Sequence, residues 1–297
     1  MKQRQKLPWR KILYEKQDYP DNFSGPEFLQ ELRRNVTAET YGFWESVRGS
    51  CVLMQEVSSV ILYVIIFAFV YSEYLSWSFL LSFCGISLVC GYLLISYLDS
   101  CTGEQRLNLT RDAKTLVTFL GFGYAMGPVF QTLTDTISTD TIYATSTVMF
   151  LLSLVFRDYG IEASIVSSAL SLNAAVFGAV CLISRLPTAN DAFTLLTAAV
   201  LMFALWPLFR QRLRLHLLRT GLTADFMEDG NVSKLDVSLT LSLAAVTLMG
   251  LAYLSLPCAC LYAAFHLFIS IGCPLWLMKL QPLKNTIHGP WDEAVVK

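Results

Sequence analysis

Two glutamates near the start of the chain have the spacing of a motif that occurs in some enzymes. Seven residues separate Glu31 from Glu39, as in some retaining glycosyltransferases. Enzymes of that kind hold the nucleotide sugar in a Rossmann-like domain of about 100 residues or more. The longest polar stretch of this chain is residues 1–50. We therefore reject the motif and predict no catalytic residue.

Metal chemistry is not indicated either. Cys258 and Cys260 have a spacing that does not fit a zinc knuckle, and His216, His266 and His288 are scattered along the chain. The sequence also lacks a glycine-rich phosphate loop, a nucleophile elbow and an HExxH motif. We expect no metal, no cofactor and no nucleic-acid partner.

Asn173 is a polar residue near the middle of the apolar segment 163–184. This segment is rich in Ser, Ala and Gly, and small residues let helix backbones approach closely in lipid. A central amide has no solvent there and must find a hydrogen-bond partner. We expect the segment to lie inside a helical bundle, where Asn173 bonds a neighbouring helix in preference to a ligand.

Three charged residues at the ends of apolar segments are further candidates for lipid contact or helix packing. Asp140 belongs to Thr139–Thr141, which forms a good helix N-cap. Asp158 is expected to form a loop ion pair with Arg157. Arg185 follows the next apolar segment.

These residues must be positioned by membrane-spanning helices. Apolar residues make up 54% of the 297 residues and charged residues only 15%, whereas soluble domains contain about 25% charged residues. Segments that approach the roughly 20 apolar residues needed to cross a bilayer occur at eight places: 52–72, 78–98, 113–134, 140–157, 163–184, 191–209, 236–254 and 257–279. We predict an all-α, polytopic helical bundle at 51–280, between an N-terminal tail at 1–50 and a C-terminal segment at 281–297.

Two of these spans carry further signals. The third contains Gly121, Gly123, Gly127 and Pro128, which predict a kink or a close helix contact. The sixth ends at Trp206-Pro207, which suits an anchor at the membrane interface.

The basic residues alternate between the links that join the spans. Of the 22 lysines and arginines, Arg185 alone lies on the side opposite the two termini. Because basic residues concentrate in cytosolic loops, both termini are predicted to be cytosolic.

The N-terminal tail contains a helix signal. Ser24–Glu27 fits a capping box with proline in the first turn. Phe28, Leu29, Leu32 and Val36 then share one helical face. We expect a short amphipathic helix that lies on the membrane or on a partner.

The link at 210–235 begins with a basic amphipathic stretch. Its candidate interfacial residues are Arg210, Arg212, Arg214 and Arg219. One interpretation is an interfacial helix attracted to anionic lipid, and the other is the ordinary excess of positive charge in cytosolic loops. The sequence leaves both open.

The C-terminal phrase, residues 287–294, has a distinctive composition. Its candidate docking residues are His288, Gly289, Pro290, Trp291, Asp292 and Glu293. The Gly-Pro pair forces a turn, and the two acidic residues would be repelled by an anionic membrane surface. We expect the phrase to dock a partner protein with Trp291 as its apolar anchor, and the alternative is a tail that rests on the membrane.

Several long motifs of this chain resemble the PIG-C family. The resemblance rests on WRKILYEKQDYPDNF (9–23), FLQELRRN (28–35), TDTIYATSTVMFLLSLVFRDYG (139–160), IVSSALSLNAAVFGAVCLISRLP (165–187), FALWP (203–207) and IHGPWDEA (287–294). It covers nearly the whole chain, and it is weakest at 220–235.

The resemblance implies a subunit of a phosphatidylinositol N-acetylglucosaminyltransferase in the endoplasmic reticulum membrane. That complex transfers GlcNAc from UDP-GlcNAc to phosphatidylinositol on the cytosolic face, as the first step of GPI-anchor synthesis. The resemblance also implies partners of the PIG-A, PIG-H, PIG-P, PIG-Q and PIG-Y types, with the sugar nucleotide held by the PIG-A type. This chain is then expected to assemble the complex and to present phosphatidylinositol.

Two other functions remain as alternatives. The glycines, Pro128 and the polar residues within the spans also fit a lipid transporter or scramblase, although the sequence shows no inverted repeat. The second alternative is an intramembrane enzyme that acts on lipid by itself.

Overall fold

The structure is a computed structural model that describes residues 16–20, 33–34, 41–102, 109–132, 136–159, 167–219, 234–283 and 287–288. The chain divides into two units. The larger is Gly42–Leu275, and the smaller combines Met1–Tyr41 with Trp276–Lys297.

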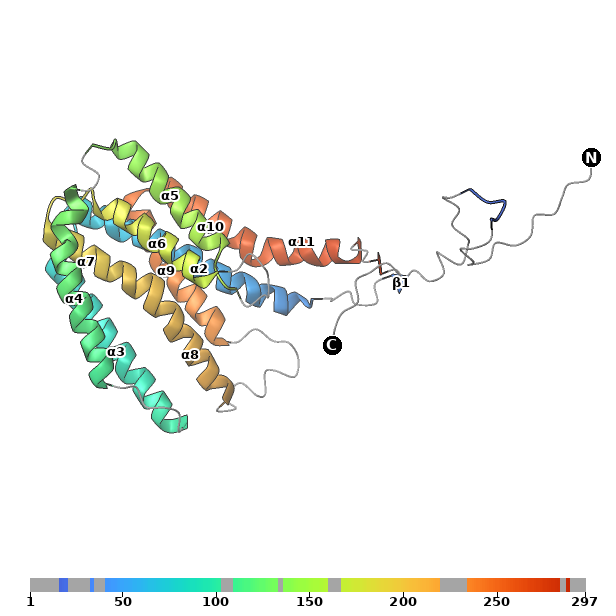
Figure 1. Ribbon diagram of the computed structural model, residues 1–297, viewed down its shortest axis with the longest axis horizontal. Coiled ribbons are helices and arrows are strands. Elements are labelled where there is room, and N and C mark those ends of the chain that lie inside the picture. The colour runs from blue at the N-terminus through green and yellow to red at the C-terminus, as the bar shows by residue number, and fades with distance from the viewer. Residues whose placement is uncertain are drawn as a thin grey trace, which may run out of the picture. The chain divides into compact units, whose positions relative to one another are not determined.

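The larger unit is built from helices (Figure 1), because a helix satisfies every backbone polar group of an apolar segment internally. In chain order these are α2 (Phe43–Tyr71), α3 (Trp77–Thr102), α4 (Leu109–Thr132), α5 (Thr139–Val155), α6 (Ser168–Ile183), α7 (Ala189–Val200), η1 (Leu201–Leu205), α8 (Trp206–Arg219), α9 (Lys234–Leu254), α10 (Leu256–Leu267) and η3 (Phe268–Gly272). The chain continues through α11 (Cys273–Leu280) and η4 (Gln281–Leu283) into the smaller unit.

The helices of the described residues overlap each of the eight predicted spans. Five helical runs are long and apolar enough to cross a membrane: Phe43–Tyr71, Trp77–Tyr97, Ala189–His216, Leu235–Leu254 and Leu256–Leu283. Helices α5 and α6 are apolar but shorter. The predicted all-α membrane bundle is confirmed, while the number of crossings and the side of the termini stay predictions.

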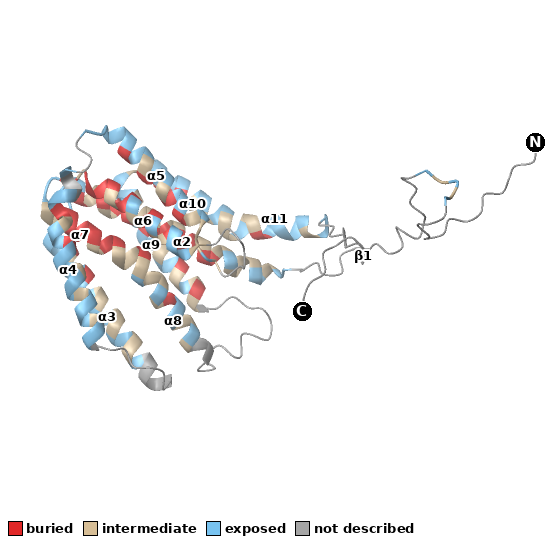
Figure 2. Ribbon diagram, in the orientation of Figure 1, coloured by how far each residue is buried: buried red, intermediate tan, exposed pale blue. Residues whose placement is uncertain are grey.

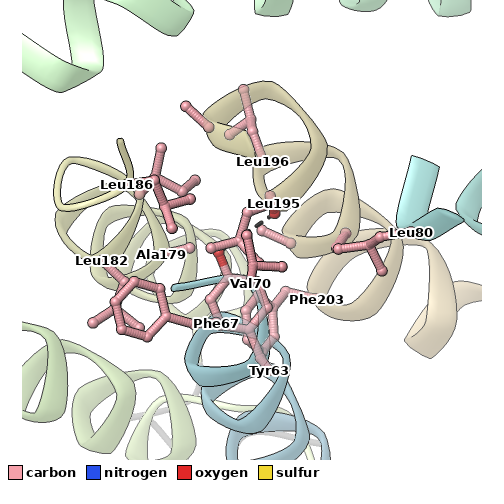
Figure 3. Packing of buried hydrophobic residues seen from close by; sticks show 14 of the residues in the cluster. Tyr63, Phe67, Val70, Leu80, Ala179, Leu182, Leu186, Leu195, Leu196 and Phe203 are labelled. Atoms are coloured by element: carbon pink, nitrogen blue, oxygen red, sulfur yellow. Dashed lines mark hydrogen bonds between the residues drawn. The ribbon is translucent and has the colours of Figure 1, made fainter. Parts of the chain in front are cut away.

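Helices α2 and α7 form the centre of the bundle. Helix α7 packs against α2, α3, α4 and α6, and α2 also packs against α5 and α9. Buried residues are concentrated on α2, α6 and α7 (Figure 2). Apolar side chains of these helices join others from α3, α5 and η1 in one cluster that includes Tyr63, Phe67, Leu195 and Phe203 (Figure 3). Within it the Tyr63 hydroxyl donates a hydrogen bond to the Leu195 carbonyl oxygen at 3.4 Å.

Three prolines lie inside continuous helical runs of the described residues: Pro128 in α4, Pro207 in α8 and Pro274 in α11. Proline has no N–H and clashes with the carbonyl four residues earlier, and five-residue π-helical turns, η1 and η3, lie just before Pro207 and Pro274. The helix continues past Trp206-Pro207 as α8, and the role of this pair as an anchor at the membrane interface stays a prediction. Ser50 Oγ of α2 donates to the Val47 carbonyl oxygen at 2.7 Å and lies 3.4 Å from the Ser270 carbonyl oxygen, which brings α2 close to η3.

The close helix contact predicted for the third span is present between α4 and α7. A Cβ atom added at Gly123 would lie 3.4 Å from the Phe193 ring, and one at Gly127 would lie 3.3 Å from the Ala189 carbonyl oxygen. Both neighbours belong to α7, so an added Cβ at Gly127 would crowd the contact between α4 and α7, whereas one at Gly123 would make an ordinary van der Waals contact.

The smaller unit contains a short antiparallel ribbon. Strand β1 (Arg33–Arg34) pairs with β2 (Ile287–His288), with Arg33 opposite His288. The amphipathic helix predicted at 24–36 lies outside the described residues except at Arg33–Arg34. Those two residues are extended, so the helix prediction is wrong there.

Candidate functional site

A group of buried polar and charged side chains joins α2, α8, α9 and the turn that follows α5. We call it the ionic cluster, and its members are Gln55, Glu56, Arg157, Arg210, Arg214, Asp236 and Thr240. Glu56, Arg210 and Asp236 are only 5%, 8% and 1% exposed. Charged residues are rarely buried so far unless they are paired, and here they are.

Arg210 is the residue that ties α8 to α2. Its Nη2 lies 2.6 Å from Glu56 Oε1, and its Nη1 donates to Gln55 Oε1 at 2.5 Å. The guanidinium group therefore bonds two successive side chains of α2. Arg157 Nη2 approaches the same Glu56 oxygen at 3.3 Å, which brings the turn after α5 to the same point.

Gln55 connects α2 to α9. Its Nε2 donates to the Asp236 carbonyl oxygen at 3.0 Å and to Thr240 Oγ1 at 2.9 Å. Thr240 Oγ1 in turn donates to the Asp236 carbonyl at 2.7 Å. Arg214 Nη2 bonds Asp236 Oδ1 at 2.6 Å, so α8 and α9 are also joined directly.

Tyr159 lies beside the ionic cluster in the turn after α5. Its hydroxyl donates to the Leu154 carbonyl at 2.8 Å. Burial raises the pKa of this hydroxyl, and the Glu56 carboxylate raises it further, against the opposing effect of Arg157 and Arg210. The hydroxyl is therefore held in its neutral, donating form, which closes the turn.

The ionic cluster is suited to holding helices together. Removing one member of a buried ion pair leaves an unpaired charge, at a cost of about 3–5 kcal/mol. The cluster thus fixes α2, α8, α9 and the α5 turn relative to one another.

Asn173 does not lie where the sequence predicts. Its side chain is exposed on α6, and no residue in the described part of the chain hydrogen-bonds it. The inward face of α6 is formed instead by small residues such as Ala175, Gly178 and Ala179. A bond between Asn173 and a neighbouring helix of the same chain is therefore not observed.

The other candidates for lipid contact or helix packing lie at helix ends. Asp140 is exposed in the first turn of α5, whose N-cap is Ser138. Arg157 bonds Glu56 across to α2, and its predicted ion pair with the exposed Asp158 stays a prediction. Arg185 Nη2 donates to the Ile137 carbonyl oxygen at 2.8 Å, which links the end of α6 to the start of α5.

The basic residues of α8 do not share one environment. Arg210 is buried and paired, so its predicted role at the lipid interface is wrong. Arg214 reaches Asp236 with its side chain 38% exposed, and Arg212 is exposed. Arg219 ends α8, but its side chain lies outside the described residues.

The predicted docking phrase is described at two residues. Ile287 and His288 form β2, while Gly289, Pro290, Trp291, Asp292 and Glu293 lie outside the described residues.

The sequence pattern did not single out Gln55, Glu56 or Asp236 as a group, although a signal was available. Arg210 and Arg214 are four residues apart, as are Asp236 and Thr240, so each pair shares one helix face. Among the described residues, no three His, Cys, Asp or Glu side chains are grouped as they would be in a metal site.

Comparison with known proteins identifies relatives along the whole chain. A family model described as GPI2, phosphatidylinositol N-acetylglucosaminyltransferase, matches residues 9–292. The human PIG-C protein of phosphatidylinositol N-acetylglucosaminyltransferase is 40% identical over 293 residues, which cover 98% of this chain and 94% of the human one. The GPI2 subunit of Schizosaccharomyces pombe is 32% identical over 298 residues, covering 98% of this chain and 88% of the yeast one. No solved structure matches the chain.

Proposed function

The chain belongs to the GPI2 family of phosphatidylinositol N-acetylglucosaminyltransferase subunits, and from that membership we propose how it serves such an enzyme. It is a multi-pass membrane subunit of the transferase that carries out the first step of GPI-anchor biosynthesis. Within that complex its part is to scaffold the other subunits and to present the lipid acceptor, without binding the sugar nucleotide itself.

The ionic cluster is the observation that carries the scaffold role. Its buried charges bond one another and hold four parts of the bundle together, as Arg210 does with Glu56 and Gln55. A rigid bundle of this kind can offer fixed outer faces to partner subunits. We propose that the partners are of the PIG-A, PIG-H, PIG-P, PIG-Q and PIG-Y types, that the lipid is phosphatidylinositol, and that the location is the endoplasmic reticulum membrane.

Reconstitution in liposomes that contain phosphatidylinositol tests this proposal. The purified chain alone should transfer no GlcNAc from UDP-GlcNAc, and the complex co-purified with it should do so. Transfer by the single chain, or failure of the chain to co-purify with any of these subunits, would overturn the proposal. Movement of lipid between leaflets by the chain alone would favour the transporter alternative.

A further inference from the structure

Asn173 presents an unpaired amide on the outer surface of an apolar helix. Its side chain is exposed, and within the described residues it has no hydrogen-bond partner. The amide group carries two N–H donors and a carbonyl acceptor. In hydrocarbon such a group is costly unless something bonds it.

The position of Asn173 along α6 keeps it away from the ends of the helix. With a rise of 1.5 Å per residue it lies about 8 Å from Ser168 at one end of α6 and about 15 Å from Ile183 at the other. Helix α6 has only 16 residues, fewer than the roughly 20 that cross a bilayer. Most of its residues are therefore expected to lie within the bilayer. The amide therefore faces the hydrocarbon or whatever covers α6 there.

Exposed hydroxyl groups on neighbouring helices do not raise the same problem. Ser82, Thr118 and Thr147 each donate to the carbonyl four residues earlier in their own helix, at 2.8 Å. Such back-bonding lets a hydroxyl face lipid with its donor satisfied. Asn173 makes no such bond to any described residue, so no described part of this chain satisfies its amide.

The residues around Asn173 form a stripe that suits a helix contact. Ala169, Leu170 and Phe177 are exposed beside it, at spacings of three or four residues along one side of α6. A small residue that lets a second backbone approach and a polar residue that can hydrogen-bond it are typical of helix interfaces in membranes, and Phe177 adds contact area. We call these four residues the α6 stripe.

We infer that the α6 stripe is the docking face for a transmembrane helix of another subunit of the transferase, and that Asn173 hydrogen-bonds a polar side chain of that helix. The inference rests on the proposed function, because it takes the chain to be part of a complex. The occupant is defined by its chemistry: an apolar helix with a small residue opposite Ala169 and an Asn, Gln, Ser or Thr at the depth of Asn173.

Photo-cross-linking in the intact complex tests the inference. A benzophenone amino acid replaces Phe177 in one version of the full chain and Phe83 in another, each co-expressed with the other subunits. The two sites are matched, because both are phenylalanines on apolar helices and are 50% and 58% exposed. We expect the probe at 177 to join one other subunit, identified by mass spectrometry, and the probe at 83 to join lipid.

The role of the amide is then tested with the probe at 177 in place. Asn173→Leu should lower the yield of the adduct about three-fold to thirty-fold, the range that corresponds to hydrogen bonds measured between membrane helices. Asn173→Gln keeps an amide and should retain more of the adduct than Asn173→Leu. Removing the amide makes the isolated helix more apolar, so poor membrane insertion cannot account for the loss.

The outcomes separate this inference from the proposed function. If the complex is recovered and active while the probe at 177 joins only lipid or a second copy of this chain, the docking face is refuted and the scaffold role stands. An adduct that is insensitive to Asn173→Leu would refute the role of the amide. If the unmodified chain is recovered without any other subunit, the proposed function fails before the stripe is tested.

Discussion

Arg210 shows how a single residue in a membrane protein takes its role from the face that it occupies. Outside a bundle an arginine at the end of a span extends toward the headgroups. In this chain its helix continues past Pro207, and the residue faces Glu56 and Gln55 inside the bundle. Its charge is then balanced by a carboxylate and not by lipid.

Replacing this residue should destabilise the protein strongly. Arg210→Gln removes the 2.6 Å bond to Glu56 and leaves the carboxylate with Arg157 at 3.3 Å. We expect a loss of about 2–3 kcal/mol in the free energy of unfolding, as for a lost hydrogen bond to a charged group, because Arg157 still pairs with Glu56. Denaturation of the purified chain in detergent measures this difference.

A matched substitution provides the control. Arg111 is exposed near the start of α4, so Arg111→Gln should change stability by no more than about 0.5 kcal/mol. Equal effects of the two substitutions would show that the buried pair contributes nothing to stability.

At the scale of elements, α5 and α6 depend on close approach because both are short. They pack side by side (Figure 1), and Ser171 Oγ of α6 donates to the Ser153 carbonyl of α5 at 2.8 Å. Gly178 lies at their contact, where an added Cβ would be 3.2 Å from the Phe150 ring and 3.3 Å from the Ser146 carbonyl oxygen. A side chain at position 178 would therefore require the neighbouring atoms of α5 to shift.

Gly178→Ala should therefore force α5 and α6 apart. We expect it to be less stable than a matched variant, Gly85→Ala, by about 1–3 kcal/mol, the usual cost of overpacking. Gly85 lies in α3 with nothing within 4 Å of an added Cβ, so the second variant gains helix propensity alone. If both variants melted at the same temperature in detergent, the α5–α6 contact would have to be looser than the structure shows.

For the whole molecule, the charge distribution predicts which side of the membrane each link faces. A glycosylation site on a spacer inserted between Pro187 and Thr188, which are exposed, should be used, because this link is predicted to be luminal. The chain carries its own control at Asn231, two residues before Ser233, which should stay unmodified on the cytosolic side. A glycan on Asn231, detected as a shift in mobility that a glycosidase removes, would reverse the predicted topology.

Truncation tests whether the C-terminal phrase contributes to assembly. Ending the chain after Asn285 removes β2, which pairs with β1 of the tail, and the residues predicted to dock a partner. We expect the helices to stay inserted, while recovery of the other subunits and transferase activity fall. Full recovery of every subunit with normal activity would rule out docking through this segment.

The helical class, the approximate positions of the helices and the shared faces along each helix could be determined from the sequence alone. A long apolar segment in lipid has to be helical because its backbone groups find no other partners, so the positions of these helices need no knowledge of their neighbours. The same reasoning located the glycines of α4, and the structure places Gly123 and Gly127 against α7.

The direction in which each face points was decided by the tertiary structure. Asn173 and Arg210 were both visible as polar residues in or beside apolar segments, and the sequence assigned the first to the inside of the bundle and the second to its surface. The structure reverses both, because Glu56 and Asp236 on two other helices supply partners for the arginines, while small residues of α6 fill the contact with α5. A helix alone defines which residues share a side, and only the charges and volumes on its neighbours decide which side turns inward.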